Sequence, residues 1–551
     1  MEPHASLLPA AAVAAPALTA AIIAVLRRHP PMRDATLLIG AAITFVIIAS
    51  MLPSVLAGEV PTTSLGQLIP GVELSLAADG MGMIFALLAS LLWVLAGSYA
   101  LGYMRGDNAS HQTRFYAFYA LCLSTAFGVA FAGDLLTFFI AYEALTVATY
   151  PLVTHKGDAK AIAAGRTYLG YLLTGGASVL LAVIIVYAST GELSFAAGGF
   201  VAGQMSTTLT IVVFLLFCVG FGTKAGLMPL HAWLPGAMVA PTPVSALLHA
   251  VAVVKGGVFA FGRMIGFVMG PEVLGAIGIQ QVLSAVAGAT IVVASVMALR
   301  QDHLKRRLAY STIAHLAYIV LGFSLLSASA YEGALLHIVN HGALKITLFF
   351  AAGAIHIAAH KDHVSELDGI GRRMPFTMVA FAVASYGLAG LPPMGGFLSK
   401  WHLVLGALEA EQYLFAGIMV FSGLFTAGYL FPIVYRAFFK PLPGEEGDAA
   451  PEPGAFGAAS PGGSSTGDEA PAAVAVATAD PQSSLARLEA GPAESHEPHE
   501  HGDHAHGEAP ALMVVPLCLT AALGLVLGLG DLTGIYELAR GVAAVVTGGG
   551  A

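Results

Sequence analysis

Runs of about 20 apolar residues recur along most of the chain, and this pattern constrains the fold more than any other feature. Each run is long enough to cross a bilayer as a helix, whereas a barrel would show shorter, alternating segments. The composition agrees, because apolar residues make up 57% of the 551 residues and charged residues only 10%. We therefore predict an all-α polytopic membrane protein with about 14 transmembrane helices.

The basic residues predict how the chain lies across the membrane. When the N-terminus is placed outside, most of the 24 lysines and arginines fall on the opposite side, and basic loops face the cytoplasm. Both termini are therefore expected on the non-cytoplasmic side. The first apolar segment, residues 5–26, ends at Arg27-Arg28 without a clear cleavage site, so we interpret it as a retained span.

Residues 441–509 differ in composition from the rest of the chain. They are rich in Pro, Gly, Ala and Ser and carry 13 acidic residues and one basic residue, Arg487. This composition predicts a disordered cytoplasmic linker. Its histidine-rich end, "SHEPHEHGDHAHGE", is interpreted as a flexible tether because nothing fixes the ligands in a geometry, and metal binding stays the alternative.

Several functional classes lack their sequence signatures. The cysteines Cys122, Cys218 and Cys518 lie singly in apolar segments, so no iron–sulfur or zinc site is expected. Neither a Walker phosphate loop nor a dinucleotide fingerprint is present. We therefore expect no metal, no cofactor and no nucleic-acid partner.

Charged residues inside the apolar runs are the strongest functional signal. Such a side chain at mid-bilayer costs at least about 2.5–3.5 kcal/mol, and the default explanation is an ion or proton pathway. Glu143 lies in the middle of the fifth segment, where its carboxylate is expected to set the charge state of a nearby lysine. A structural ion pair is the alternative. Asp134 stands at the start of the same segment and either contributes or caps the helix.

The stretch "VGFGTKAGLMPLHAWLP" predicts a helix broken inside the membrane. Pro229 and Pro235 cannot continue an ideal helix, and a break frees backbone groups that are tolerated only inside protein or beside a cavity. Lys224 beside this break is expected to be hydrated and able to titrate. His231 in the same stretch is a secondary candidate.

A second break is predicted in the stretch "YGLAGLPPMGGFLSKWHLV". Pro392 and Pro393 interrupt the twelfth span and Lys400 follows. Interrupted segments in corresponding positions of two halves are typical of inverted-repeat transporters. We therefore predict two inverted five-helix repeats, spans 4–8 and 9–13.

Two further segments carry titratable residues. His337, His341 and Lys345 recur every fourth residue, so they line one face of the eleventh span and form a plausible proton wire. Polar contacts that hold helices together are the alternative. In the eighth span, Lys255 is a relay candidate, whereas His249 is either functional or a satisfied core histidine.

These motifs resemble the proton-conducting antiporter-like subunits of respiratory complex I and of Mrp cation/proton antiporters. The resemblance covers about residues 80–440 and rests on "GDLLTFFIAYEALTVATYPLV", "GFGTKAGLMPLHAWLPGAMVAPTPVSALLH", "LKRRLAYSTIAHLAYI" and "GLAGLPPMGGFLSKW". It implies a 14-helix fold and a relay of the charged residues above, with His315 in the third motif as a secondary candidate. It also implies other membrane subunits as partners in a prokaryotic inner membrane.

The resemblance is strongest to the D-type Mrp subunit, because the twelfth-span residue is lysine and only a short tail follows the last span. It implies exchange of H⁺ for a monovalent cation, with Na⁺ expected. The alternatives are a proton-pumping subunit of complex I or of a membrane-bound hydrogenase, and an energy-coupling subunit of a bicarbonate-accumulating complex. We expect five parts along the chain. They are the first three spans (residues 1–110), the two five-helix repeats (111–270 and 275–440), the linker (441–509) and the last span with a short tail (510–551).

Overall fold

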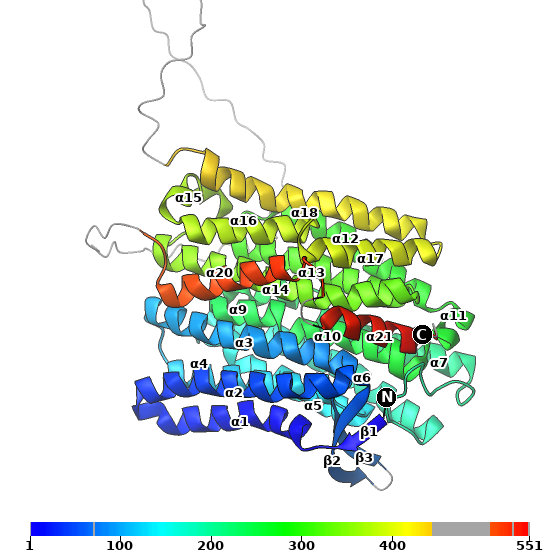
Figure 1. The fold of residues 1–551 in the computed structure, drawn as a ribbon. Helices are drawn as coiled ribbons and strands as arrows, with labels where there is room; N and C mark the ends of the chain where they lie inside the picture. Colours follow the sequence, from blue (N-terminus) through cyan, green and yellow to red (C-terminus); the bar gives the residue numbers. More distant parts are fainter. Residues whose placement is uncertain (1, 70–71, 443–506, 532–533, 549–551) are drawn as a thin grey trace, which may run out of the picture. The chain divides into compact units, whose positions relative to one another are not determined.

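The computed structural model describes residues 2–69, 72–442, 507–531 and 534–548 of the chain (Figure 1). Within these ranges the chain is mostly helical, and a helix or a pair of helices lies at every predicted span. By length and composition, 11 of the described helices can cross a membrane. The predicted fold class is therefore confirmed, whereas the count of about 14 spans stays a prediction.

The first half of the chain begins with two apolar helices and continues to an interrupted one. Its helices are α1 Leu8–Val25, the short η1 Leu26–Arg28, α2 Pro30–Leu56, α3 Gly80–Gly106, α4 Gln112–Phe131, α5 Leu135–Val153, α6 Ala159–Thr190, α7 Thr207–Ala225, α8 Trp233–Gly236 and η2 Ala237–Val239.

The remaining helices include a second interrupted span. They are α9 Thr242–Ala250, α10 Val253–Arg263, the π-helix η3 Met264–Met269, α11 Pro271–Ile277, α12 Gln280–Arg300, α13 Leu304–Ser324, α14 Ala328–Ala359, η4 Val364–Glu366, α15 Ile370–Arg373, α16 Pro375–Ala389, α17 Gly395–Glu409, α18 Tyr413–Phe439, α20 Ala511–Val526 and α21 Ile535–Thr547.

Both predicted breaks are present. Helix α7 ends at Ala225, and Gly226 takes a left-handed conformation that terminates it. Residues 226–232 form turns before the short α8. Helix α16 ends in the same way at Gly390, and α17 begins at Gly395. The interruptions therefore fall at the positions that the prolines and glycines predicted.

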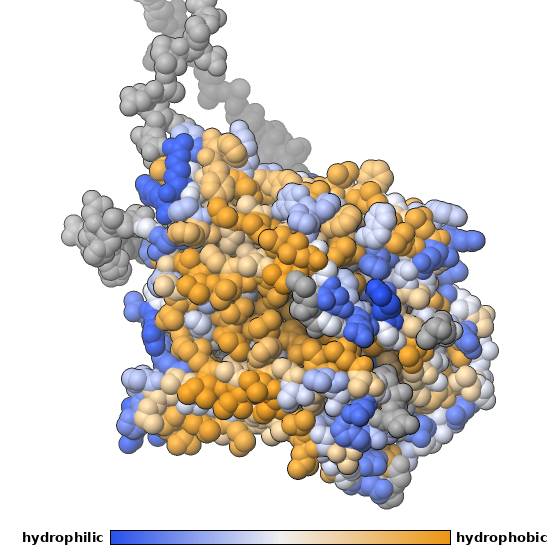
Figure 2. Space-filling model, in the orientation of Figure 1, coloured by the Kyte–Doolittle hydropathy of each residue, from blue (hydrophilic) through white to orange (hydrophobic). Residues whose placement is uncertain are grey.

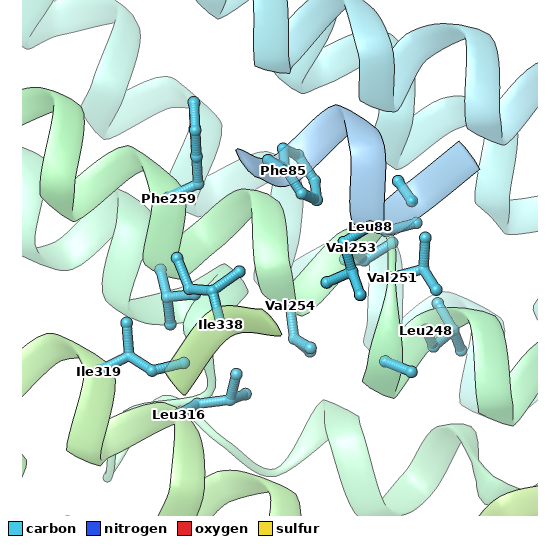
Figure 3. Packing of buried hydrophobic residues seen from close by; sticks show 14 of the residues in the cluster. Phe85, Leu88, Leu248, Val251, Val253, Val254, Phe259, Leu316, Ile319 and Ile338 are labelled. Carbon is cyan, nitrogen blue, oxygen red and sulfur yellow. The ribbon is translucent and has the colours of Figure 1, made fainter. Parts of the chain in front are cut away.

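A third interruption, which the sequence analysis did not predict, divides the eighth span. Helix α9 ends at Ala250 and α10 begins at Val253, with Ala252 outside helical geometry. The break is buried, and apolar side chains from α3, α9, α10, α13 and α14 lie near it (Figure 3). Val251 and Val253 are fully buried there. The stretch "HAVAVVKGG" contains no proline, and the packing therefore had to reveal this break.

The structure also contains a small sheet and a terminal helix that the sequence analysis did not predict. Strand β1 Glu2–Ala5 pairs in parallel with β2 Glu59–Ile69, which pairs antiparallel with β3 Val72–Ala77. Helix α21 has apolar residues at helical spacing and packs on α14 and α3. Its pattern was readable in the sequence, but the region was predicted only as a short tail.

The surface has the distribution expected of a membrane protein. In Figure 2 hydrophobic residues cover the middle of the helices, and hydrophilic residues gather toward their two ends. The predicted linker, residues 441–509, lies mostly outside the described residues, as do its five terminal histidines. Its last part belongs to the folded body, because the Glu508 carboxylate accepts hydrogen bonds from the Phe376 and Thr377 amides at the start of α16. The predicted boundaries of the parts stay predictions.

Candidate functional site

Lys224 lies at the C-terminal end of α7 and is 1% exposed. Its ammonium donates a hydrogen bond to the Tyr142 carbonyl of α5 at 2.5 Å and lies 3.3 Å from the centre of the Tyr142 ring. A carbonyl dipole and a ring face both stabilise a positive charge. These two contacts favour the protonated form of Lys224 without a direct ion pair.

Glu143 lies beside this lysine but does not contact it. Lys224 acts on the carboxyl group electrostatically, yet no ion pair within 4.0 Å joins the two in the described part of the chain. The Glu143 Oε1 atom is buried without a hydrogen-bond partner. Gly176 of α6 makes room for the carboxylate, because a Cβ at that position would meet it at 2.5 Å. The carboxylate is thus a nearby countercharge that is free to change partners.

A cluster of histidines occupies the centre of the second half. Lys255 and His341 are both fully buried, and the Lys255 Nζ atom lies 2.9 Å from His341 Nδ1. His315 Nδ1 lies 3.1 Å from His337 Nε2. Figure 3 shows apolar side chains of the same three helices, α10, α13 and α14, among them Val254, Leu316 and Ile338. Lys255 of α10 therefore lies in contact with His341 of the row on α14.

His315 is more central than its secondary rank suggested. Its ring stacks on those of His337 and His341 with both centroids at 5.3 Å, whereas those two rings lie 6.1 Å apart. The predicted row on α14 is therefore bridged by a residue from α13. The sequence signal, "STIAHLAYI", places a histidine in an apolar helix but cannot show which neighbour it faces.

The chain of polar contacts continues to hydroxyl groups that sequence analysis missed. His337 Nδ1 lies 2.9 Å from the Ser399 hydroxyl of α17. Lys345 donates to the Ser311 hydroxyl of α13 at 2.8 Å, and Ser311 lies 2.9 Å from the Tyr429 hydroxyl. Serine is common in membrane helices, so its identity alone carries no functional signal.

Lys400 lies in α17, just after the second break. It donates hydrogen bonds to the Leu388 and Ala389 carbonyls at the end of α16, at 2.7 and 3.3 Å. These are carbonyls that the interruption leaves without helical partners. Its ammonium also lies 5.3 Å from the centre of the Tyr318 ring, which stacks on His315.

The three remaining candidates stand apart from these groups. Asp134 accepts from the Thr137 amide at 2.7 Å, the N-cap contact of α5, and from the Ser75 amide at 3.0 Å. His249 is buried against the Phe349 ring, and neither ring nitrogen has a hydrogen-bond partner. His231 lies in the turns after α7 near the Tyr310 ring. Within the described ranges, none of the three shares a hydrogen bond with the buried lysines.

The Glu143–Lys224 group and the histidine cluster are not in direct contact in the described residues. Helix packing brings their helices together, because a Cβ at Gly257 of α10 would meet the Lys224 backbone at 2.8 Å. Transfer of a proton between the two groups therefore needs water or side-chain movement.

Paired titratable groups lie where α13 begins and α14 ends. Asp362 contacts His356 at 3.1 Å, and this hydrogen bond lowers the pKa of the carboxyl to about 2. Burial lowers the pKa of His303 to about 4. Asp302 is bound by Ser365 and lies 3.4 Å from His363. These groups lie on the side predicted to face the cytoplasm, and each carboxylate there has a partner.

The comparison with family models identifies the chain's relatives. Residues 132–426 match the family described as "NADH:quinone oxidoreductase/Mrp antiporter, TM". This match spans the helices that carry Glu143, Lys224, Lys255, His337 and Lys400. The chain belongs to this family. It is therefore an integral multi-pass membrane protein of the antiporter-like type found in Mrp or complex I-like complexes.

Individual members of the family give the same result. The chain is 37% identical over 393 residues to NADH-quinone oxidoreductase subunit N of Desulforudis audaxviator, which covers 70% of this chain and 77% of the relative. It is 30% identical over 421 residues to a probable K(+)/H(+) antiporter protein of Rhizobium meliloti, covering 74% of this chain but 41% of the relative. The chain therefore spans less than half of that antiporter protein.

A solved structure supports the fold. A chain in the structure of the Mrp complex from Dietzia sp. DQ12-45-1b matches with a TM-score of 0.79, 21% identity and 98% coverage of both chains. The recognition of the family from the sequence is confirmed. Its narrower assignment to the D-type Mrp subunit stays a prediction.

Proposed function

We propose that this chain is the proton-translocating subunit of a multi-subunit monovalent cation/H⁺ antiporter, with Na⁺ as the expected cation. The observation that carries the proposal is the buried series of contacts from Lys255 through His341, His315 and His337 to Ser399. Each member can accept and donate a proton. Hydrogen-bond distances join all neighbouring members except His341 and His315, whose rings stack with centroids 5.3 Å apart.

The first half supplies the regulated part of the path. Glu143 provides a negative charge near Lys224, and proximity of this charge favours the protonated lysine. If the carboxylate moved or took up a proton, Lys224 would release its own proton more readily. A proton leaving Lys224 would reach Lys255 through water or by side-chain movement. Other membrane subunits of the complex would carry or admit the cation.

A second candidate function is proton pumping within a complex I-like quinone oxidoreductase. The observation that favours it is the 37% identity to an oxidoreductase subunit N. The lysine at position 400 favours the antiporter in our interpretation, because one type of complex I subunit carries glutamate there. Neither proposal requires a redox centre in this chain.

Proton flux in membrane vesicles that contain the partner subunits tests the proposal. A pH gradient is formed across the vesicles, and we expect added Na⁺ or K⁺ to collapse it in the wild type. We expect Lys345→Ala to lose this response, whereas Lys156→Ala, which removes an exposed lysine, should retain it. A gradient that responds to a quinone-reducing donor and not to cations would favour the second candidate.

A further inference from the structure

The buried contact series has an end that points away from the predicted cytoplasmic side. Ser399, its last member, lies on α17 beside His337. One helical turn further along α17, on the same face, lies His402. Helix α17 ends at Glu409, on the side where α14 begins and where α21 packs against α14. The series is therefore directed toward the first turns of α14.

An acidic residue of α14 lies at this place. Glu332 is 7% exposed, and its Oε1 atom has no hydrogen-bond partner. His402 Nδ1 lies 4.0 Å from Glu332 Oε2, and Arg540 Nε of α21 lies 3.9 Å from Oε1. The Tyr536 hydroxyl of α21 donates to the Leu527 carbonyl and acts on Glu332 only at longer range. A buried carboxylate oxygen that makes no hydrogen bond costs about 1–3 kcal/mol and needs a reason.

The backbone is built to bring these groups together. A Cβ at Gly333 would meet the Leu403 amide nitrogen at 2.7 Å and His402 atoms at 3.0 Å. The absence of a side chain at Gly333 thus allows α17 to approach α14 beside Glu332. Side-chain exposure then rises from 10% for Glu332 to 25% for His402 and 73% for Arg540. Hydrophilic residues also gather on the surface over α21 (Figures 1 and 2). Buried and exposed titratable groups therefore lie next to each other at this end of the relay.

We propose that His402 and Glu332, with Arg540 as a mobile countercharge, form the port through which the relay exchanges protons with the non-cytoplasmic side. This proposal rests on the proposed proton-translocating function. His402 takes a proton from the Ser399 end of the relay and passes it to the Glu332 carboxylate. The resulting carboxylic acid releases the proton to water, and Arg540 stabilises the carboxylate that remains. Only the proton moves, so no bond between heavier atoms changes.

The simpler explanation is an ion pair that fastens α21 to α14. The geometry does not favour it, because the two contacts of Glu332 are long and Arg540 is mostly exposed. An exposed pair of this kind contributes at most about 1 kcal/mol. On the predicted cytoplasmic side, by contrast, the Asp362 and Asp302 carboxylates are hydrogen-bonded.

The test uses the complete complex in vesicles of both orientations, with the pH varied on one side at a time. Glu332→Gln and His402→Gln should each lower cation-driven proton flux about 10-fold or more, as loss of a positioned proton carrier does. Their remaining flux should no longer respond to pH on the non-cytoplasmic side but should still respond on the cytoplasmic side. Glu332→Asp should recover part of the flux. Glu537→Gln, on the exposed face of α21, is the matched control and should behave as wild type.

Flux is expressed per assembled complex, so that instability is separated from loss of transport. Wild-type flux and wild-type pH responses in both Glu332→Gln and His402→Gln would overturn the port. If Arg540→Gln and Glu332→Gln lowered the amount of assembled complex equally and left flux per complex unchanged, the pair would only fasten α21 to α14. This result would also overturn the port. If Lys345→Ala retained full flux as well, the proposed function itself would fail. If Lys345→Ala lost flux and the port variants did not, only the port would fail.

Discussion

Lys224 and Lys400 occupy similar places in the two halves of the chain, yet their surroundings differ. Lys224 bonds a carbonyl in the middle of another helix, lies against the Tyr142 ring and has Glu143 nearby. Lys400 bonds two carbonyls at the end of α16, released by the break that it follows. No carboxylate ion pair to Lys400 occurs among the described residues.

The expectation that each lysine is hydrated by its own helix break stays a prediction. Lys400 contacts carbonyls that its break releases. Lys224 precedes its break, and its ammonium is directed to α5. An ionisable neighbour therefore acts on Lys224, whereas Lys400 contacts fixed backbone dipoles. We infer that the first half is the regulated site and the second half the constant one.

The largest expected effect is the loss of either lysine. Lys224→Ala and Lys400→Ala should each reduce cation-driven proton flux at least about 100-fold, because each removes a positioned proton carrier. Flux is measured in vesicles and normalised to assembled complex. Retention of half the flux in one variant would remove that half of the chain from the pathway.

Next in size is the effect of neutralising Glu143. Glu143→Gln should reduce flux at least about 10-fold, and Glu143→Asp should be intermediate because the charge remains but its reach is shorter. Because Glu143 lies near Lys224 and no such carboxylate pairs with Lys400 in the part of the chain that the structure describes, we also expect Glu143→Gln to change the pH at which flux is half-maximal. Lys156→Ala serves as the control. An unchanged pH profile would show that Lys224 is not governed by this carboxylate.

A matched pair of glycine substitutions probes the two surroundings more gently. A Cβ at Gly176 would meet the Glu143 carboxylate at 2.5 Å, and one at Gly390 would meet the Lys400 Cδ at 2.7 Å. Gly390 also has a φ of 88°, which strains any other residue. Gly176→Ala should shift the pH profile of flux, whereas Gly390→Ala should lower the rate and leave the pH profile unchanged. Each added methyl group should also destabilise the folded chain by about 1–3 kcal/mol. Gly417→Ala, with open space around it, is the control.

The smallest effect on flux is expected at Asp134. Its Oδ1 atom caps α5, and its Oδ2 atom accepts hydrogen bonds from the Ser75 amide and the Thr137 hydroxyl. Asparagine keeps the cap, but its NH₂ group cannot accept from the Ser75 amide. Asp134→Asn should therefore leave flux per complex unchanged but lower the free energy of unfolding by about 1–3 kcal/mol. A loss of flux comparable to that of Glu143→Gln would place Asp134 in the relay.

Sequence reasoning succeeded where chemistry and local geometry coincide. Prolines and glycines marked both breaks correctly, and charged residues in apolar segments pointed to the buried lysines. It failed where helices meet. The central position of His315, the Ser399 contact and the buried break between α9 and α10 depend on how the helices pack, and the sequence of one helix does not show this. The sequence analysis did not single out Glu332, because it lies near the end of a span, where acidic residues are common and carry no functional signal.

The central claim is that both lysines change protonation during transport, and conversion to arginine tests it most directly. Arginine keeps the positive charge but does not release its proton, since its pKa stays above about 12. Cation-driven proton flux should be measured for Lys224→Arg and Lys400→Arg across pH in vesicles with all partner subunits. The account predicts that both variants are strongly impaired at every pH, although the complex assembles. Wild-type flux in either variant would show that its lysine is a fixed charge and would contradict the account.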